Sequence, residues 1–316
     1  MILDCHMHSW RYPRHFNRDV MLANQPPRRR VWSEEQFAQM WELPVERYLE
    51  EMKGSEVGKA LLLGLKAGST LGIEVDNDYL AGLVRQRPEL LAWACCVTPT
   101  EAGAAAEVER SVRELGAVAI GELGPVYGSF RVDDPNCFSV WEVARDLDVP
   151  LVIHAGPAQA RWGHLKYGDL MAVDEIAIQF PDLTIVICHL GYHRYEEAAF
   201  LVAKHENVYA DISWLPQLAG FDRRALSRYL PQVEYGYYHL IHPLLYSFTQ
   251  TFGLTDKLLW GTDFPAGAPA KSIESLIGIN AWLDQHSLPR IPRESLHRML
   301  HENWQKVFAR LSGSRG

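Results

Sequence analysis

The segment Ile2-Leu3-Asp4-Cys5-His6-Met7-His8 decides how the whole chain is interpreted. Its apolar residues indicate a short buried strand that begins almost at the N-terminus. Because side chains alternate between the two faces of a strand, His6 and His8 are predicted to share one face, with Asp4 below them. The apolar side chains between them are predicted to point the opposite way: Leu3, Cys5 and Met7. Two imidazoles placed in this way can both reach one divalent metal ion.

Outward from this segment, short apolar runs alternate with stretches of helical spacing. We interpret eight runs as strands, at residues 2–8, 59–64, 90–97, 117–122, 149–154, 183–189, 207–213 and 256–263. Helices are predicted at 34–53, 76–87, 102–115, 134–146, 169–180 and 195–205, with a terminal helix at 292–311. Short, continuous apolar strands are typical of parallel strands buried on both faces. The repeat predicts an α/β fold in which residues 1–316 form a single (β/α)8 TIM barrel domain.

Two segments lie outside this repeat. Residues 9–33 are predicted to form a long loop after strand 1, and their aromatic residues indicate an ordered lid. Within this loop, Arg28-Arg29-Arg30 is either a solvated run or the source of an arginine for a substrate carboxylate. The aromatic-rich segment 214–250 predicts an extra helical insertion between strands 7 and 8. We expect this insertion either to pack over the barrel or to form a homodimer interface.

Composition and charge argue against several other classes of protein. A net charge of −8 does not suit a nucleic-acid partner. No run approaches the roughly 20 apolar residues that a membrane helix needs, so we expect no membrane association. The five cysteines form no metal-binding CxxC pattern, and no leader-like segment precedes the first strand. We therefore expect reduced thiols and a cytoplasmic protein.

Residues of the metal-binding types stand at the carboxyl ends of five predicted strands: His6 and His8, Glu122, His154, His189 and Asp263. The carboxyl ends of barrel strands meet at one rim, where such enzymes hold their active sites. We therefore predict that these six residues share one metal site. Imidazole and carboxylate donors without a thiolate suit divalent Zn, Mn, Fe or Co, and they do not distinguish one of these metals from the others.

Aromatic residues follow several of the same strands and indicate what the site binds. They suit an apolar or cyclic small-molecule substrate better than a sugar or a polyphosphate. The residues that we expect to contact it are Trp10, Arg11, Trp162, Tyr192 and Trp214.

Five stretches carry a resemblance to a known family: residues 3–8, 150–154, 188–191, 259–265 and 302–308. The most specific is Gly261-Thr-Asp-Phe-Pro265, together with its distance from the first His-x-His. On these residues the chain resembles the amidohydrolase superfamily. Within that superfamily it resembles the branch named for aminocarboxymuconate-semialdehyde decarboxylase. The resemblance runs from one end of the chain to the other, and it implies the same barrel.

The resemblance also implies roles for individual residues. It places a catalytic metal on His6, His8, His154 and Asp263, with Asp263 also acting as a base and His189 as a polarising or proton-handling group. Glu122 departs from that branch and is similar to the binuclear hydrolases of the superfamily, in which such a glutamate bridges two metals. The resemblance therefore leaves open whether the site holds one metal ion or two. Two ions would be held by His6, His8, Glu122 and Asp263, and by Glu122, His154 and His189.

We predict a metal-dependent hydrolase with one or two divalent Zn, Mn or Fe ions. A metal-bound hydroxide would attack an ester, lactone or amide, Asp263 would take its proton, and His189 or the second metal would hold the oxyanion. One alternative is non-oxidative decarboxylation of an aromatic or muconate-like acid, with Arg11 or Arg161 on the carboxylate. A second alternative is oxygenation at a dinuclear non-haem iron centre, and a third is a metal-binding scaffold without catalysis.

Overall fold

Eight parallel strands of the computed structural model form one sheet, in the order β1-β2-β5-β6-β7-β8-β9-β10. The structure describes residues 1–24, 33–158, 160–216, 237–249 and 256–312. The strands are β1 (Ile2–Met7), β2 (Val57–Leu63), β5 (Leu91–Cys95), β6 (Ala119–Leu123), β7 (Leu151–Ile153), β8 (Ile185–Ile187), β9 (Val208–Asp211) and β10 (Leu258–Leu259). Each overlaps a predicted strand, and most are shorter than the apolar run that predicted them.

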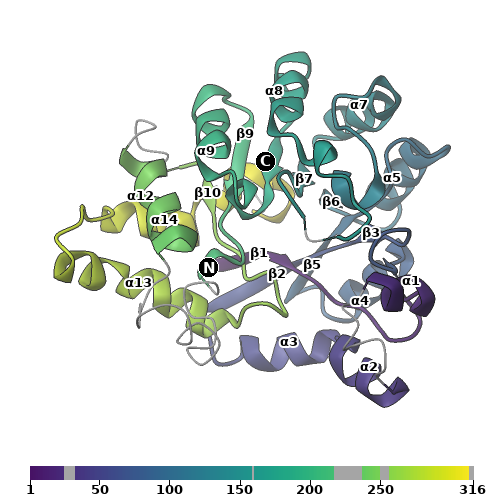
Figure 1. Cartoon of the computed structure of the whole chain (residues 1–316), viewed down its shortest axis with the longest axis horizontal. Helices are drawn as coiled ribbons and strands as arrows, with labels where there is room; N and C mark the ends of the chain where they lie inside the picture. The colour runs from purple at the N-terminus through teal and green to yellow at the C-terminus, as the bar shows by residue number, and fades with distance from the viewer. Residues whose placement is uncertain (25–32, 159, 217–236, 250–255, 313–316) are drawn as a thin grey trace.

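Helices surround these strands (Figure 1). They are α3 (Val45–Met52), α4 (Asn77–Gln86), α5 (Ala104–Arg113), α7 (Phe138–Asp146), α8 (Leu170–Gln179), α9 (Tyr195–Lys204), α13 (Pro269–Gln285) and α14 (Arg293–His301). Two of them begin where an aspartate caps the first turn. The side chain of Asp76 accepts a hydrogen bond from the backbone of Tyr79, and Asp169 accepts one from Met171. Such caps satisfy amide groups that the helix itself leaves unpaired.

The first and last strands close the sheet into a barrel. The backbone N–H of Asp263 donates to the carbonyl of His6 at 2.8 Å, and that of His8 donates to the carbonyl of Phe264 at 3.1 Å. The predicted (β/α)8 barrel is confirmed. Closure also places the residue that follows β10 next to the histidines that end β1.

The buried carboxylate of Asp4 joins β1 to both β10 and α3. One oxygen accepts hydrogen bonds from the backbone N–H groups of Thr262 (2.9 Å) and His6 (3.2 Å). The other accepts from the Thr262 hydroxyl at 2.6 Å and from the Tyr48 hydroxyl at 2.7 Å. Burial raises the pKa of Asp4, although the hydrogen bonds from Thr262 and Tyr48 oppose this effect. Asp4 therefore serves the closure of the barrel.

The predicted alternation of side chains along the first strand is only partly correct. Asp4 does not lie with His6 and His8 in one polar cluster, because its carboxylate reaches α3. Cys5 belongs to the apolar interior of the barrel, whereas Met7 packs in the outer layer with the helices. The physical reason is that the pairing of β1 with β2 shifts register between Asp4 and Met7, and such an irregularity interrupts the two-residue period.

Alternate strand residues fill the interior of the barrel with a small apolar cluster. Its members are Cys188, just after β8, and the strand residues Leu3, Cys5, Leu61, Leu63, Ala92, Ala94, Ala119, Val152, Val186 and Leu259. The strand residues between them pack outward against the helices in a larger cluster. The polar residues at the strand ends therefore stand on a close-packed base, which resists local displacement.

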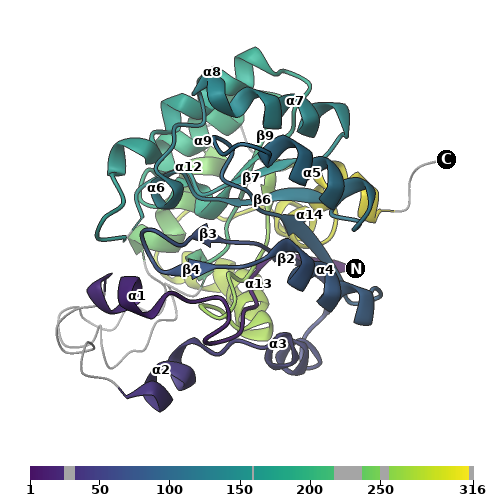
Figure 2. The ribbon, with the colours of Figure 1, turned by 90° about the vertical axis from the view of Figure 1, so that its right-hand side faces the viewer.

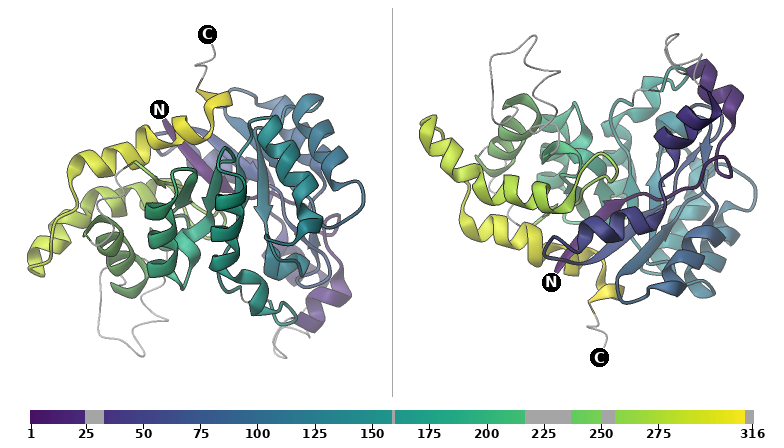
Figure 3. Two further views of the ribbon diagram at one scale, coloured as in Figure 1. Left: turned by 90° about the horizontal axis from the view of Figure 1, so that it is seen from above. Right: turned by 90° about the horizontal axis from the view of Figure 1, so that it is seen from below.

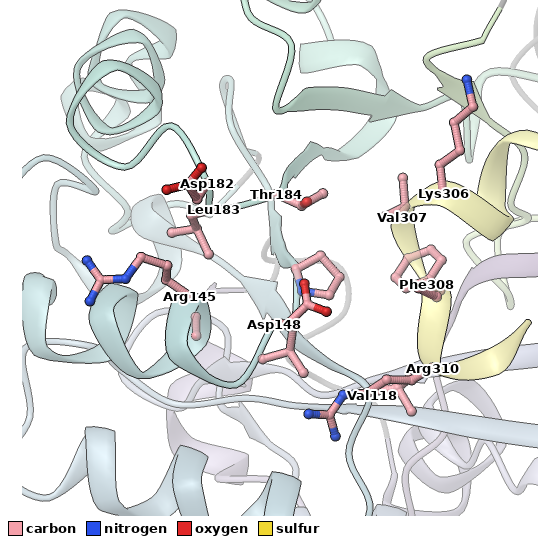
Figure 4. A pocket seen from close by; sticks show the side chains of 14 residues that line it. Val118, Arg145, Asp148, Asp182, Leu183, Thr184, Lys306, Val307, Phe308 and Arg310 are labelled. Carbon is pink, nitrogen blue, oxygen red and sulfur yellow. The ribbon is translucent and has the colours of Figure 1, made fainter. Parts of the chain in front are cut away.

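The C-terminal segment closes the opposite end of the barrel. Trp304, Val307 and Phe308, in and just after α15 (Asn303–Val307), join the interior cluster. A cavity beside Val307 and Phe308 is lined by residues that precede β6, β7 and β8, among them Val118 and Thr184 (Figure 4). This cavity thus lies at the amino ends of the strands. Both views of Figure 3 show the C-terminal helices beside the start of β1.

Several helices differ from the prediction. The loop after β1 contains α1 (Arg18–Asn24), and β3 (Lys66–Ala67) pairs with β4 (Ile73–Glu74) beside it (Figure 2). The predicted helix 34–53 is two helices, α2 (Glu34–Trp41) and α3, because Pro44 precedes a new first turn. The predicted terminal helix 292–311 is divided into α14, α15 and a 3-10 turn, Ala309–Leu311. Helix α13 was not predicted.

The helical insertion between β9 and β10 is described only in part. Residues 237–249 form a π-helical turn, Tyr237–Ile241, and α12 (His242–Thr249), as the prediction of extra helices requires. Residues 217–236 and 250–255 lie outside the described part of the chain, as does the predicted arginine run at 28–30. None of the helices in the described ranges combines the length and the apolar character that a membrane crossing requires.

We expect Tyr48→Phe to lower the free energy of unfolding by about 1.5–3 kcal/mol, because it removes a hydrogen bond to a buried charged group. Chemical denaturation followed by circular dichroism measures this change. Tyr167→Phe is the matched control, since the Tyr167 hydroxyl makes no hydrogen bond within the described residues. Equal stability of the two variants would show that the Asp4 network does not stabilise the closed barrel.

Candidate metal centre

The carboxylate of Glu122, near the end of β6, lies among four imidazoles. Its Oε2 atom is 3.4 Å from His8 Nε2 and 3.8 Å from His6 Nε2. Its Oε1 atom is 2.7 Å from His154 Nδ1 and 3.6 Å from His189 Nε2. Glu122 is buried, and so are His6, His8 and His189. The structure therefore brings together residues from the ends of four different strands. Each oxygen of the Glu122 carboxylate faces a different pair of histidines.

Asp263 completes one side of this cluster. Its Oδ1 atom lies 3.6 Å from His6 Nε2 and 3.4 Å from His8 Nε2. Donor atoms bound at 2.0–2.2 Å around a tetrahedral ion lie about 3.4 Å apart. His6 Nε2 and His8 Nε2 thus stand 3.4–3.8 Å from an oxygen of Glu122 and from an oxygen of Asp263, close to that separation, so these four residues could hold one ion. We call them the first ligand set.

The hydrogen bonds of His6 and His8 leave the right nitrogen free for a cation. The Nδ1 atom of His8 is 3.2 Å from the carbonyl of Leu63, which can only accept, so Nδ1 carries a proton and Nε2 is the nitrogen left to bind a cation. His6 Nδ1 faces an Asp211 oxygen at 3.1 Å. His6 Nε2 is buried without a hydrogen-bond partner in the described part of the chain. A lone pair directed at carboxylates is unfavourable unless a cation lies between them, and the residues present therefore fit a metal ion.

The remaining donors, Glu122, His154 and His189, form a second ligand set with a different geometry. The 2.7 Å contact between His154 Nδ1 and Glu122 is a hydrogen bond, and it is too short for two ligands of one ion. His189 Nδ1 is 2.8 Å from the hydroxyl of Ser213, which leaves its Nε2 facing Glu122. An ion in the second ligand set requires His154 and Glu122 to separate.

The electrostatics of the cluster favour a bound cation. Burial would raise the pKa of the Glu122 carboxyl, but hydrogen bonds from His154 and the other imidazoles hold it well below its usual range. Burial would lower the pKa of His8, but hydrogen bonds with Asp263 and Glu122 raise it to about 9. In the absence of metal, protons on histidines thus supply part of the positive charge that buried carboxylates require.

The backbone is strained where these side chains leave their strands. His189, Trp214 and Asp263 have φ angles of 53°, 67° and 54°, in the left-handed region that non-glycine residues seldom adopt. Each lies just after a strand, β8, β9 or β10. Such conformations cost on the order of 1–3 kcal/mol each and cluster at functional sites. The strain therefore coincides with the predicted site.

Asp211, at the end of β9, is a site residue that the sequence analysis missed. It is fully buried, and its carboxylate contacts both His6 and the backbone of His189. Burial would raise its pKa, but the neighbouring His6 lowers it to about 2. The sequence feature that could have identified Asp211 is the same as for Glu122 and Asp263: an acidic residue at the carboxyl end of a predicted strand.

The structure brings three of the five predicted substrate-binding residues to the cluster. The Trp10 ring stacks on His8 with centroids 5.8 Å apart, and the Trp214 ring is 6.0 Å from His189. Tyr192 packs on Trp214 at 4.5 Å.

The other two predicted substrate-binding residues lie apart from the cluster. Arg11 is paired with Glu42, and Trp162 is exposed after β7. In the described ranges neither has a hydrogen bond, ion pair or ring contact with the four histidines. The backbone of Arg161, the alternative carboxylate ligand, bonds Asn24.

Residues 3–310 match the family model described as Amidohydrolase. No functionally curated protein matches the chain. Among solved structures, 5-carboxyvanillate decarboxylase from Sphingomonas paucimobilis is 16% identical, with a TM-score of 0.66, over 98% of each chain. A probable 2-pyrone-4,6-dicarboxylic acid hydrolase from Acinetobacter baumannii is 15% identical, with a TM-score of 0.60, over 98% of this chain and 99% of the other. An amidohydrolase from Burkholderia multivorans with bound zinc is 15% identical, with a TM-score of 0.65 and the same coverage.

We expect His6→Gln and His8→Gln each to remove metal from the purified protein while the barrel still folds, because the site stands on a separate apolar base. Elemental analysis measures the metal, and circular dichroism measures the fold. His164→Gln, at an exposed histidine, is the control that should keep wild-type metal content. Full metal occupancy in both site variants would exclude these residues as ligands.

We also expect zinc to displace a proton from the metal-free site. With a pKa of about 9, His8 is protonated at neutral pH, so a cation must compete with that proton. Zinc affinity should therefore rise with pH between pH 6.5 and 8, by up to about tenfold per unit for each proton released. Calorimetric titration in buffers of different ionisation enthalpy counts the protons. An affinity independent of pH would contradict this assignment.

Proposed function

The chain belongs to the amidohydrolase family of metal-dependent enzymes, and we propose that it hydrolyses an ester, lactone or amide bond with two metal ions. The observation that carries this proposal is the position of Glu122. One of its oxygens faces His6 and His8, while the other faces His154 and His189. A carboxylate in this position could bridge two cations, and two cations could activate a water and polarise the carbonyl that it attacks.

We assign the two ions to the two ligand sets. The imidazoles of the first ligand set already stand 3.4–3.8 Å from both carboxylates, so this set should bind the tighter ion. The second ligand set must first break the hydrogen bond between His154 and Glu122, so it should bind more weakly. The imidazole and carboxylate donors suit zinc, manganese or iron. When bound, such an ion polarises a carbonyl oxygen and lowers the pKa of a coordinated water to about 7.

Asp263 is the residue proposed to accept the proton of the attacking water. Its side chain is 20% exposed, compared with 5% for Glu122, so it is the more accessible of the two carboxylates. A positioned base of this kind contributes about 10²–10⁴-fold to a rate. Tyr127, whose ring lies 5.2 Å from His154, is a candidate donor to the developing oxyanion. Burial, Glu122 and Asp263 all raise the pKa of the Tyr127 hydroxyl, which keeps its proton available.

A groove beside Trp10 is proposed to receive the body of the substrate. It is lined by apolar and aromatic side chains with one cation: Trp10, Met40, Trp41, Leu43, Arg47 and Pro265, joined by Gln36 and Gln39. The Arg47 guanidinium lies 5.7 Å from the ring centroid of Phe264, the residue that follows Asp263. This lining supports an apolar or cyclic substrate that carries an acidic group near Arg47.

Non-oxidative decarboxylation of an aromatic acid is the second candidate. It is favoured by the folds that resemble this one, which include 5-carboxyvanillate decarboxylase and, from Rhizobium, 2,6-dihydroxybenzoate decarboxylase. In that reaction Asp263 or His189 would protonate the carbon that loses carbon dioxide. Arg47, rather than Arg11, is then the cation best placed for a carboxylate, because Arg11 is paired with Glu42.

Metal content distinguishes these candidates. We expect protein purified without added metal to hold up to two zinc or manganese ions per chain and to hydrolyse members of a panel of aryl esters and lactones. One ion per chain, with carbon dioxide released from hydroxybenzoates, would favour decarboxylation instead. Two irons with oxygen consumption would favour the oxygenase alternative.

We expect Asp263→Asn to lower turnover by roughly 10²–10⁴-fold, because the amide keeps the shape of the side chain but cannot accept the proton. Its metal content should fall less than that of His6→Gln. Steady-state kinetics and elemental analysis of the same preparation separate the two effects. Asp169→Asn, at the N-cap of α8, is a control for loss of one carboxylate elsewhere. Normal turnover with normal metal content in Asp263→Asn would rule out this base.

A further inference from the structure

The carboxylate of Asp211 contacts one histidine from each ligand set, His6 and His189. Its Oδ2 atom is 3.1 Å from His6 Nδ1, in the first ligand set. Its Oδ1 atom accepts the backbone N–H groups of His189 at 3.0 Å and Ser213 at 2.9 Å, and the Ser213 hydroxyl at 2.5 Å. Each oxygen thus serves a different half of the cluster. Within the described residues, no hydrogen bond joins the Asp211 carboxylate to any other member of the two ligand sets.

The direction of each hydrogen bond in this network follows from its acceptors. Because Asp211 is a carboxylate, His6 must donate from Nδ1, and the Ser213 hydroxyl must donate as well. The Ser213 oxygen is then an acceptor for His189 Nδ1, 2.8 Å away. The Ser213 carbonyl, 3.2 Å from the same nitrogen, can also only accept. Both histidines therefore carry the proton on Nδ1 and present the Nε2 lone pair to the cluster.

We propose that Asp211 and Ser213 are positioning residues that set the tautomers of His6 and His189, and so couple the two metal positions through one carboxylate. This inference rests on the proposed function, because it takes His6 and His189 as ligands of the two sets. Its physical basis is that a histidine binds a metal only through an unprotonated nitrogen, so the partner of the other nitrogen decides whether binding is possible.

The variant Asp211→Asn is expected to change the tautomer of His6. The amide oxygen can replace Oδ1, where three N–H or O–H groups donate, and this places the amide NH2 against His6 Nδ1. His6 Nδ1 must then accept, and its proton moves to Nε2, where a cation has to displace it before it can bind. Ser213→Ala removes the hydroxyl that links His189 Nδ1 to Asp211, but the backbone carbonyl of residue 213 can still accept the hydrogen bond from His189. It should therefore weaken only the second ligand set, and less severely.

The test is zinc titration of the full chain, with zinc itself as the probe. We expect Asp211→Asn to weaken zinc binding about 10–100-fold, the usual effect of losing such a partner. We expect Asp211→Glu, which keeps the charge, to recover part of this loss. Asp174→Asn is the control, because this carboxylate pairs with Lys204 and His205, outside both ligand sets. It should leave zinc affinity unchanged.

A spectroscopic measurement separates tautomer control from a general loss of structure. In zinc-free protein labelled with nitrogen-15 at histidine, the proton on His6 Nδ1 should give a downfield resonance that is absent in His6→Gln. Asp211→Asn should lose this resonance while its circular dichroism is unchanged. Wild-type zinc affinity together with an unchanged resonance in Asp211→Asn would overturn this inference and leave the proposed function intact. A wild-type chain that binds no zinc, manganese or iron would overturn both.

Discussion

Closure of the barrel between β1 and β10 is the constraint on which the site depends. Most of its candidate ligands come from the ends of different strands, so they meet only if the eight strands return to their starting point. The Asp4 carboxylate fixes that closure, because it accepts four hydrogen bonds from β1, α3 and the residue that precedes Asp263. One buried acid outside the cluster thus holds Asp263 next to His6 and His8.

The cluster itself works against folding, and the rest of the barrel must compensate. Three buried or partly buried carboxylates, Glu122, Asp211 and Asp263, lose hydration, and left-handed backbone at His189 and Asp263 adds strain. The stabilising contribution comes from the apolar layers on both faces of the strands. This division explains why the site can hold strained, charged groups: the elements that carry them are fixed by packing that does not involve them.

The sequence was sufficient for the barrel and for the six strand-end residues, because both depend on short-range patterns that repeat. The sequence was insufficient where a contact between residues distant in the chain changes the regular alternation of side chains or determines the role of a residue. The register shift in β1 turned Asp4 toward Tyr48, and no local signal marks that shift. Asp211 has the same strand-end position as the other carboxylates, but its role depends on His6, which is distant in the sequence and adjacent only in the closed barrel. The polar partner of Arg11, Glu42, lies on a segment whose position relative to the first loop could not be predicted.

In the proposed site, the number of bound ions would depend on the hydrogen bond between His154 and Glu122. While His154 donates a hydrogen bond to Oε1 of Glu122, only Oε2 is available to an ion in the first ligand set. If the bond opens, the second oxygen becomes a ligand and Glu122 becomes a bridge. The same residues can therefore form a one-ion or a two-ion site with little movement of the backbone. On the proposed function, hydrolysis and decarboxylation would differ in the occupancy of the second ligand set rather than in the architecture, because Asp263 belongs to the first ligand set in both cases.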